Sequence, residues 1–174
     1  MVLDVGCGPG TAASLFPADS RVIGLDFSIS MLRSAKTQIP NLVQGSAFNL
    51  PFRNCSLDVV TCLFVASDYS DKMGIFYEAQ RVLKEDGFLL FSDYSVNDGH
   101  WKLKRAIRSL RRERGNIFLE DEALLSSEMR KAGFEVQEAK HLRFSISFQL
   151  ERYIRSDDEM NQLKTNDTDL WDRM

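Results

Sequence analysis

Three glycines spaced two residues apart give the start of the chain the character of a ligand site. Gly6, Gly8 and Gly10 follow a short apolar run, VLDV at residues 2–5, and precede a helix-compatible stretch at residues 11–16. Glycine can adopt positive φ and lets the backbone approach a ligand without a Cβ in the way. The amides at the start of the next helix then face whatever lies in the turn. This order of strand, glycine turn and helix is typical of a nucleotide-binding α/β unit.

An acidic residue follows at the place where a ribose could be held. Asp26 ends the second apolar run, RVIGL at residues 21–25, and lies twenty residues after Gly6. A carboxylate at the end of the second strand can accept hydrogen bonds from both hydroxyls of a ribose. The alternative is that Asp26 serves the start of the helix predicted from Ser28, because Asp favours such positions.

The elements that position these residues follow from hydrophobic periodicity. Apolar runs predict further strands at residues 41–44, 57–65 and 88–91. The run at residues 57–65 alternates little, as does a strand that is buried on both faces of a parallel sheet. Helical spacing predicts helices at residues 28–38 and 72–83, the second followed by a turn at residues 85–87. Strands that alternate with helices indicate a parallel, doubly wound α/β sheet.

The second half of the chain predicts two helices and a hairpin. The segment WKLKRAIRSLRRER at residues 101–114 has seven basic residues and one acidic residue on an amphipathic helical pattern. It could bind an anionic partner, cover a pocket or form a solvated face, which is the usual role of such charge runs. A further helix is predicted at residues 120–132, ended by Gly133. Strands at residues 134–139 and 142–150 must be antiparallel, because their link is too short for a crossover.

Composition limits the possible functions. A net charge of −3 argues against a generic nucleic-acid binder. We find neither an apolar run of membrane-spanning length nor a leader pattern, and we expect a cytoplasmic protein without membrane contact. The cysteines and histidines lack metal-ligand spacing, so we predict no disulfide framework and no metal site. We expect one domain at residues 1–155 and a loosely ordered acidic tail at residues 156–174.

Together, these segments resemble the class I S-adenosylmethionine-dependent methyltransferases of the type 11 family. The resemblance covers residues 2–150 and rests on five segments in order: VLDVGCGPG, GLDFS, NLPF, SLDVVTC and RVLKEDGFLLFSDY. The glycines follow the order G-x-G-x-G, which differs from the G-x-G-x-x-G of nicotinamide dehydrogenases. The resemblance implies a Rossmann-like three-layer sandwich. Its mostly parallel seven-stranded sheet would have the order 3-2-1-4-5-7-6, with strand 7 antiparallel.

The resemblance also implies roles for single residues. The glycine turn would lie against the methionine part of S-adenosylmethionine, Asp26 would bind its ribose, and Phe27 would lie against adenine. The implied cofactor-binding residues are Asp4, Gly6, Cys7, Gly8, Gly10, Asp26, Phe27, Ser46, Ala47, Phe48, Leu63 and Phe64. Ser46 stands where family members usually have an acid, and a serine accepts hydrogen bonds without charge assistance.

The implied reaction is methyl transfer to a small-molecule acceptor by in-line displacement. Such a step depends mainly on the alignment of the two reactants, and a general base matters only for acceptors that arrive protonated. The sequence alone assigns no catalytic residue. Polar residues near the expected pocket mouth are the candidates: Asp68, Tyr69, Asp93, Tyr94 and His100.

Three other readings stay open. The chain could be a catalytically silent, methyltransferase-like binding subunit, an RNA methyltransferase that uses the basic segment at residues 102–114, or, least in accord with the glycine spacing, a dehydrogenase. Family proteins usually have one or two helices before the first strand, whereas this sequence begins with that strand. We therefore expect a second copy or a partner chain to supply the cover of the site.

Overall fold

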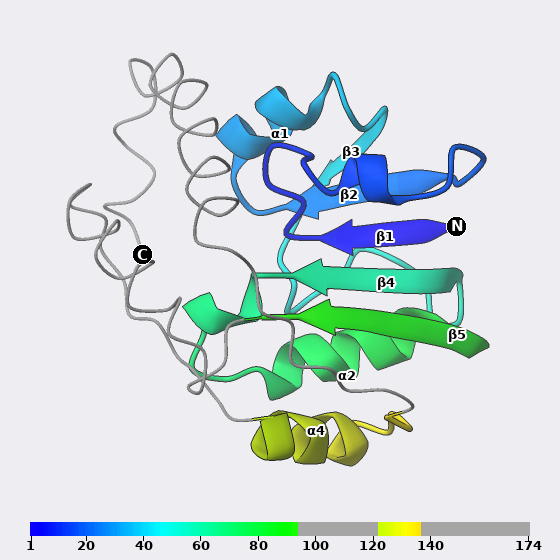
Figure 1. Ribbon diagram of the computed structural model, residues 1–174, viewed down its shortest axis with the longest axis vertical. Coiled ribbons are helices and arrows are strands. Elements are labelled where there is room, and N and C mark those ends of the chain that lie inside the picture. The colour runs from blue at the N-terminus through cyan, green and yellow to red at the C-terminus, as the bar shows by residue number, and fades with distance from the viewer. Residues whose placement is uncertain (94–121, 137–174) are drawn as a thin grey trace. The chain divides into compact units, whose positions relative to one another are not determined.

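Five parallel strands form the centre of the molecule in the computed structural model, which describes residues 1–93 and 122–136. The strand order is β3-β2-β1-β4-β5 (Figure 1). The strands are Val2–Val5 (β1), Val22–Asp26 (β2), Asn41–Gln44 (β3), Leu57–Leu63 (β4) and Leu83–Ser92 (β5). The chain proceeds outward from β1 in one direction and from β4 in the other. Open α/β sheets bind ligands beyond the carboxyl ends of their strands at such a switch point.

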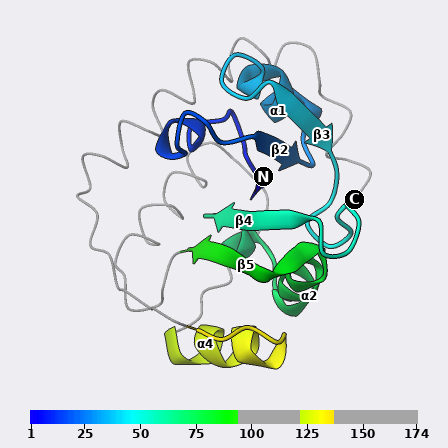
Figure 2. The same ribbon diagram turned by 90° about the vertical axis from the view of Figure 1, so that its right-hand side faces the viewer.

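Helices cover both faces of this sheet (Figure 2). Helix α1, Ile29–Ala35, packs on β2 and β3, and its buried residues share a cluster with Val22. Helix α2, Met73–Val82, packs on the opposite face, in the main core cluster that contains Leu3 and Val60. Because Val2 pairs with Val22 and Leu3 pairs with Ile23, these two clusters lie on opposite faces of the sheet. The fold is the doubly wound, Rossmann-like α/β fold that the sequence predicts.

Local sequence explains where the helices form. Ser28 is the N-cap of α1, and its hydroxyl accepts a hydrogen bond from the Met31 amide at 3.4 Å. In α2 the predicted apolar face is buried, namely Ile75, Phe76, Ala79 and Val82. Helix α4, Glu122–Lys131, lies within the helix predicted at residues 120–132. Gly133 follows with φ +97°, as expected of a glycine that ends a helix.

The helix predicted at residues 11–16 is wrong in type and length. The structure has a single 3-10 turn, Ala13–Leu15, and Phe16 is already extended with ψ 145°. Pro17 follows, and a residue before proline avoids the helical region because of a clash with the proline ring. Too few residues therefore remain between Gly10 and Pro17 for an α-helix.

Two strand boundaries also differ from the prediction. Strand β4 ends at Leu63, not at residue 65, because Phe64 has φ +61° and turns the chain out of the extended conformation. The turn predicted at residues 85–87 falls within β5. At this place Leu57 of β4 pairs with Leu83 of β5, and Val59 pairs with Phe88. Strand β5 therefore uses five residues where β4 uses two, which makes a local irregularity in the pairing.

Part of the predicted architecture lies outside the described residues. This applies to the basic segment at residues 101–114, the strand predicted at residues 142–150 and the tail at residues 156–174. Of the strand predicted at residues 134–139, residues 134–136 are described and belong to no strand. The positions of strands 6 and 7 therefore remain predictions.

Candidate functional site

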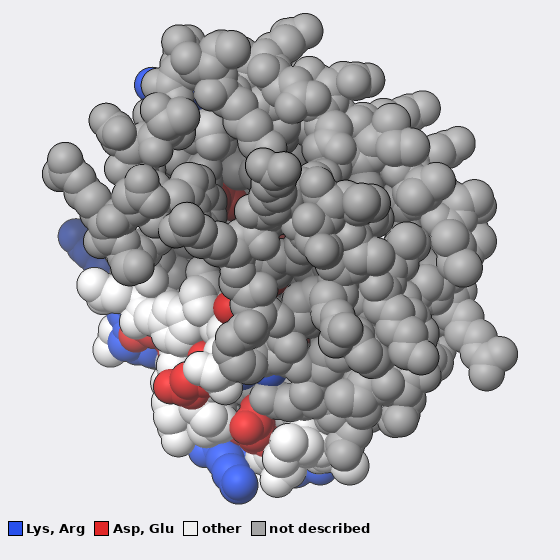
Figure 3. All heavy atoms as spheres, turned by 90° about the vertical axis from the view of Figure 1, so that its left-hand side faces the viewer, with Lys and Arg blue, Asp and Glu red and all other residues white. Residues whose placement is uncertain are grey.

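The candidate site lies at the carboxyl ends of the strands, to which the arrowheads in Figure 1 point. The described loops that follow β1, β2, β3 and β4 begin at this edge, because parallel strands end at the same edge of a sheet. Figure 3 views the molecule from this side. Acidic and basic side chains are mixed on the described surface in that view, so the described residues there do not form a patch of one charge.

The three glycines of the turn after β1 have three different surroundings. All have positive φ: +68° for Gly6, +53° for Gly8 and +85° for Gly10. A Cβ on Gly6 would lie 2.3 Å from Val65 Cγ2, and a Cβ on Gly10 would lie 3.0 Å from Gln38 Cβ. A Cβ on Gly8 would have no atom of residues 1–93 or 122–136 within 4 Å. Gly6 and Gly10 therefore permit close packing within the protein, whereas Gly8 presents bare backbone to open space.

Cys7 turns its side chain away from this open space into the protein. Its thiol is buried in the cluster between β2 and α1, and a Cβ on Gly24 would lie 2.9 Å from Cys7 Sγ. Burial, with the nearby charges of Asp26 and Asp4, raises the pKa of this thiol to about 12. Cys7 is therefore protonated at neutral pH and is not a nucleophile.

Asp26 braces the glycine turn from the end of β2. Its Oδ2 accepts a hydrogen bond from the Gly8 amide and its Oδ1 accepts one from the Ser28 amide, each at 2.8 Å. Burial raises the pKa of the carboxyl group, and these backbone hydrogen bonds oppose that rise. Asp26 thus also contacts the start of α1, as the alternative interpretation of this residue expects, although the N-cap of the helix is Ser28. Each carboxylate oxygen has two lone pairs, so the same group has capacity left for ligand hydroxyls.

Asp4 is a buried acid within β1. It is 2% exposed, and its Oδ1 accepts a hydrogen bond from Thr61 Oγ1 at 2.8 Å. The two residues are directly paired across the β1–β4 register. Sequence reasoning identified Asp4 but not Thr61. The available signal was a hydroxyl residue in the middle of the apolar run LDVVTCLFV.

The loop after β4 is held by contacts with its neighbours on both sides. Phe64 has positive φ and donates its amide to the Ser92 carbonyl at 2.7 Å. Val65 packs against Gly6, and the Ser67 amide donates to Asp93 Oδ2 at 2.6 Å. A non-glycine residue with this φ is held there by its surroundings at an energetic cost, and such residues cluster at functional sites. Asp93, one of the candidate general bases, thus supports this loop through its carboxylate.

Aromatic side chains border the same end of the sheet. Phe48 and Tyr69 make an edge-to-face contact with ring centroids 4.9 Å apart, and each is 37% exposed. Phe27, after Asp26, is 46% exposed. Burial raises the pKa of the Tyr69 phenol, with further contributions from Asp68 and Asp26. Tyr69 is thus a protonated hydrogen-bond donor at neutral pH and not a general base.

The turn after β3 continues this border. Its first residue, Gly45, donates its amide to the Asp26 main-chain carbonyl at 3.1 Å. Ser46 Oγ accepts a hydrogen bond from the Phe48 amide at 3.2 Å, which closes the turn, and Ala47 is buried. The Gly45 hydrogen bond thus ties the start of this turn to the main chain of Asp26.

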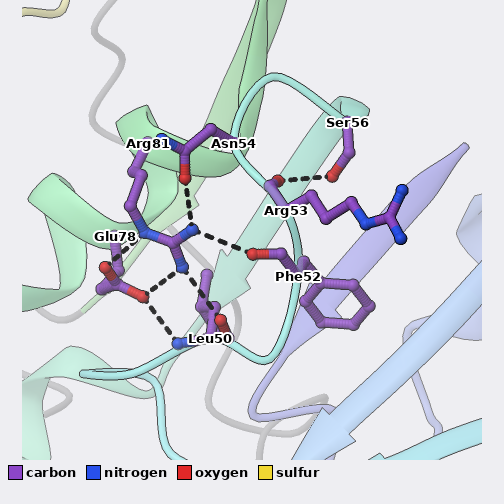
Figure 4. A network of polar contacts seen from close by, with 7 residues as sticks. All are labelled: Leu50, Phe52, Arg53, Asn54, Ser56, Glu78 and Arg81. Carbon is purple, nitrogen blue, oxygen red and sulfur yellow. Dashed lines mark hydrogen bonds and ion pairs between the residues drawn. The ribbon is translucent and has the colours of Figure 1, made fainter.

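A polar network that sequence reasoning missed lies directly behind this turn (Figure 4). Arg81 of α2 donates to both carboxylate oxygens of Glu78, at 2.7 Å each. It also donates to two main-chain carbonyls, of Leu50 and Phe52, and to the side chain of Asn54. The motif RVLK contains this arginine, and Glu78 lies three residues before it, but its partners in the loop are 27 to 31 residues away, which no local pattern shows.

The remaining predicted site residues are only partly described by the structure. Leu63 and Phe64 are at the end of β4 as expected, whereas Tyr94 and His100 are outside the described residues. Within residues 1–93 and 122–136, no three His, Cys, Asp or Glu side chains are grouped as metal ligands would be. In the same part of the chain, no helix combines the length and the apolar character needed to cross a membrane.

Comparison with known protein families agrees with the fold. The model of a methyltransferase domain, of the type 11 class, matches residues 3–91, which is just over half of the chain. The chain belongs to the type 11 methyltransferase family. This stretch contains the glycine turn, Asp26, the turn after β3 and the Arg81 network. Fold and family are those of S-adenosylmethionine-dependent methyltransferases.

Curated relatives of this methyltransferase-family chain include two named as methyltransferases. The uncharacterized methyltransferase YcgJ of Bacillus subtilis is 37% identical over 106 residues, which are 56% of this chain and 42% of YcgJ. A malonyl-[acyl-carrier protein] O-methyltransferase of Herminiimonas arsenicoxydans is 29% identical over 168 residues, which are 95% of this chain and 60% of that protein. This chain thus spans less than two thirds of the length of either relative.

Solved structures have the same fold. The crystal structure of YcgJ has a TM-score of 0.67 at 25% identity and covers 97% of this chain and 78% of its own. A Haloferax volcanii chain in complex with the Trm112 methyltransferase activator has a TM-score of 0.67 at 23% identity, over 83% of this chain and 67% of its own. Phosphoethanolamine N-methyltransferase 2 of Haemonchus contortus, in complex with S-adenosyl-L-methionine, has a TM-score of 0.64 at 22% identity. That match covers 97% of this chain and 41% of its own.

Proposed function

We propose that this chain binds S-adenosylmethionine at the carboxyl edge of the sheet and transfers its methyl group to a small-molecule acceptor. The observation that carries the proposal is the pairing of Gly8 with Asp26. Gly8 presents backbone without a side chain to a space that the described part of the chain leaves open, and Asp26 holds the Gly8 amide at 2.8 Å. A cradle that a Cβ would fill, next to a carboxylate with remaining acceptor capacity, suits a ligand that has a ribose.

The described residues fit the parts of this cofactor. Asp26 would accept from the ribose hydroxyls, and the exposed ring of Phe27 would lie against the adenine. The turn at residues 46–48 would border the edge of the adenine, where Ser46 takes the place of the usual acid. Asp4 is fixed by Thr61 beneath the glycine turn and would favour the cationic methionine end.

When bound, S-adenosylmethionine would supply a methyl group on a cationic sulfur: a nucleophile of the acceptor would form a bond to the methyl carbon while the carbon–sulfur bond breaks, and the sulfur would leave as a neutral thioether. The protein contributes alignment, because no obligatory acid–base pair is needed for such a transfer. The loop at residues 63–69 would line the acceptor side. Tyr69 would orient the acceptor by donating a hydrogen bond, since its phenol stays protonated, and Asp68 is the described carboxylate on the same loop.

Calorimetric titration with S-adenosylmethionine and with its demethylated product tests this proposal. Wild type should bind both, and Asp26→Asn should weaken binding by about 1–3 kcal/mol, the cost of hydrogen bonds lost at a buried partner. Asp19→Asn is the matched control, since Asp19 is exposed before β2, at the other end of that strand. No binding of either ligand near millimolar concentration would refute the proposal. Binding without transfer to any acceptor in a methyl-acceptor screen would favour the silent binding subunit.

A further inference from the structure

One face of α2 contacts the loop that follows β3. Gly74, Glu78 and Arg81 are four and three residues apart, so they lie on the same face of the helix. The buried residues of α2 occupy a different face, which packs into the main core. The face with Gly74, Glu78 and Arg81 contacts the loop at residues 46–54 instead.

The contacts of Glu78 and Arg81 hold the main chain of Leu50 from both sides. Glu78 Oε2 accepts a hydrogen bond from the Leu50 amide at 2.6 Å, and Arg81 Nη2 donates to the Leu50 carbonyl at 2.9 Å (Figure 4). Arg81 uses all five of its N–H groups, three of them on Leu50, Phe52 and Asn54 and two on Glu78. We name this Glu78–Arg81 pair, with its contacts to residues 50–54, the α2 clamp.

The same helix face also supports the turn itself. A Cβ on Gly74 would lie 2.8 Å from Phe48 Cδ1, so the Phe48 ring lies directly against the helix backbone at Gly74. The turn at residues 46–49 is therefore held in two places: the Phe48 ring packs against Gly74, and the α2 clamp binds the main chain of Leu50, directly after the turn.

We propose that Glu78 and Arg81 are positioning residues that fix the adenine side of the cofactor site. This inference rests on the proposed function, in which the turn at residues 46–48 borders the adenine. The turn starts at Gly45, whose amide bonds the Asp26 carbonyl, so one end of it is anchored at the ribose residue and the other at the α2 clamp.

Loss of the clamp should shift the turn without unfolding the protein. Leu50 and Ala47 are buried in the main core cluster, 3% and 9% exposed, and retain that packing when the polar contacts are removed. Arg81→Lys keeps the positive charge, but an ammonium group cannot reproduce the planar fork that reaches Glu78 and several carbonyls at once. Glu78→Gln keeps the size of the side chain and removes the charge that strengthens these hydrogen bonds.

The experiment measures the dissociation constants of two ligands for the full chain. The ligands are S-adenosylhomocysteine and S-inosylhomocysteine, which has an oxygen in place of the 6-amino group of the adenine. Wild type should prefer the adenosyl compound by ~3–10-fold, the worth of about one hydrogen bond. Arg81→Lys should weaken adenosyl binding by a similar factor and bring the preference close to one, and Glu78→Gln should have a smaller effect in the same direction.

Arg53→Lys is the control, because Arg53 is exposed on the same loop and its side chain points away from the clamp in Figure 4. It should leave both dissociation constants unchanged. If wild type binds neither ligand, the proposed function fails. If wild type binds and Arg81→Lys, shown to be folded by circular dichroism, has the wild-type affinity or loses affinity equally for both ligands, the positioning role is overturned and the clamp is only structural.

Discussion

Replacing Gly6 and Gly8 separately by alanine should separate the packing role of the glycine turn from its ligand role. Both positions have positive φ, which costs an L-residue ~1–2 kcal/mol. At Gly6 the new Cβ would also lie 2.3 Å from Val65 Cγ2, and such overpacking adds ~1–3 kcal/mol. Gly6→Ala should therefore lower the free energy of unfolding by about 3 kcal/mol, and Gly8→Ala by only about 1 kcal/mol.

Ligand affinity should respond in the opposite way: at temperatures where both variants are folded, Gly8→Ala should weaken binding more than Gly6→Ala does. The Cβ of Gly8→Ala would project into the open space assigned to the cofactor, so affinity for S-adenosylhomocysteine should fall about tenfold or more. Urea denaturation gives the first quantity and calorimetry gives the second. In a double-mutant cycle, Val65→Ala should recover part of the Gly6→Ala loss, because it removes the two methyl groups in closest contact. Equal destabilisation by the two alanines, or wild-type affinity of Gly8→Ala, would refute this reading of the turn.

Two further predictions concern polar contacts, one buried and one partly exposed. Thr61→Val keeps the side-chain shape but removes the 2.8 Å hydrogen bond to Asp4, so the free energy of unfolding should fall by ~1–3 kcal/mol. Thr61→Ser keeps the hydroxyl group and should retain most of the wild-type stability. Equal losses of stability for the two variants in urea denaturation would contradict this prediction. The hydrogen bond from Arg81 lowers the pKa of Glu78 below its usual 4.5, so the α2 clamp contributes stability that is present above pH 4.5 and is lost as pH falls through the lowered value. Hydrogen exchange of the Leu50 amide should consequently lose protection in acid in wild type and show no such step in Glu78→Gln.

Local patterns were sufficient for the elements that build the sheet. Strands β1 and β3 have the predicted bounds, and the order 3-2-1-4-5 of the described strands is the predicted one. The apolar face of α2 is buried as its periodicity indicates. The strand bounds and the buried face of α2 depend on residues that are close together in the sequence, and for that reason they can be read from it. The strand order depends on distant pairings, and its prediction came from the family resemblance and not from local patterns.

The failures arise where distant contacts or backbone constraints decide. Nothing near Gly6 indicates that its missing Cβ makes room for Val65, 59 positions later. The partners of Asp4 and Arg81, namely Thr61 and the carbonyls of Leu50 and Phe52, were invisible for the same reason. The helix predicted before Pro17 failed because the proline shortened it to one turn.

The most direct test of the central claim is a crystal structure of the full chain with S-adenosylhomocysteine. The ligand should lie at the carboxyl edge of the sheet, with its ribose on the Asp26 carboxylate, the backbone of Gly8 beside its amino-acid end, and its adenine between Phe27 and the turn at residues 46–48. A ligand bound elsewhere, or an Asp26 carboxylate without a ribose contact in the complex, would contradict the account.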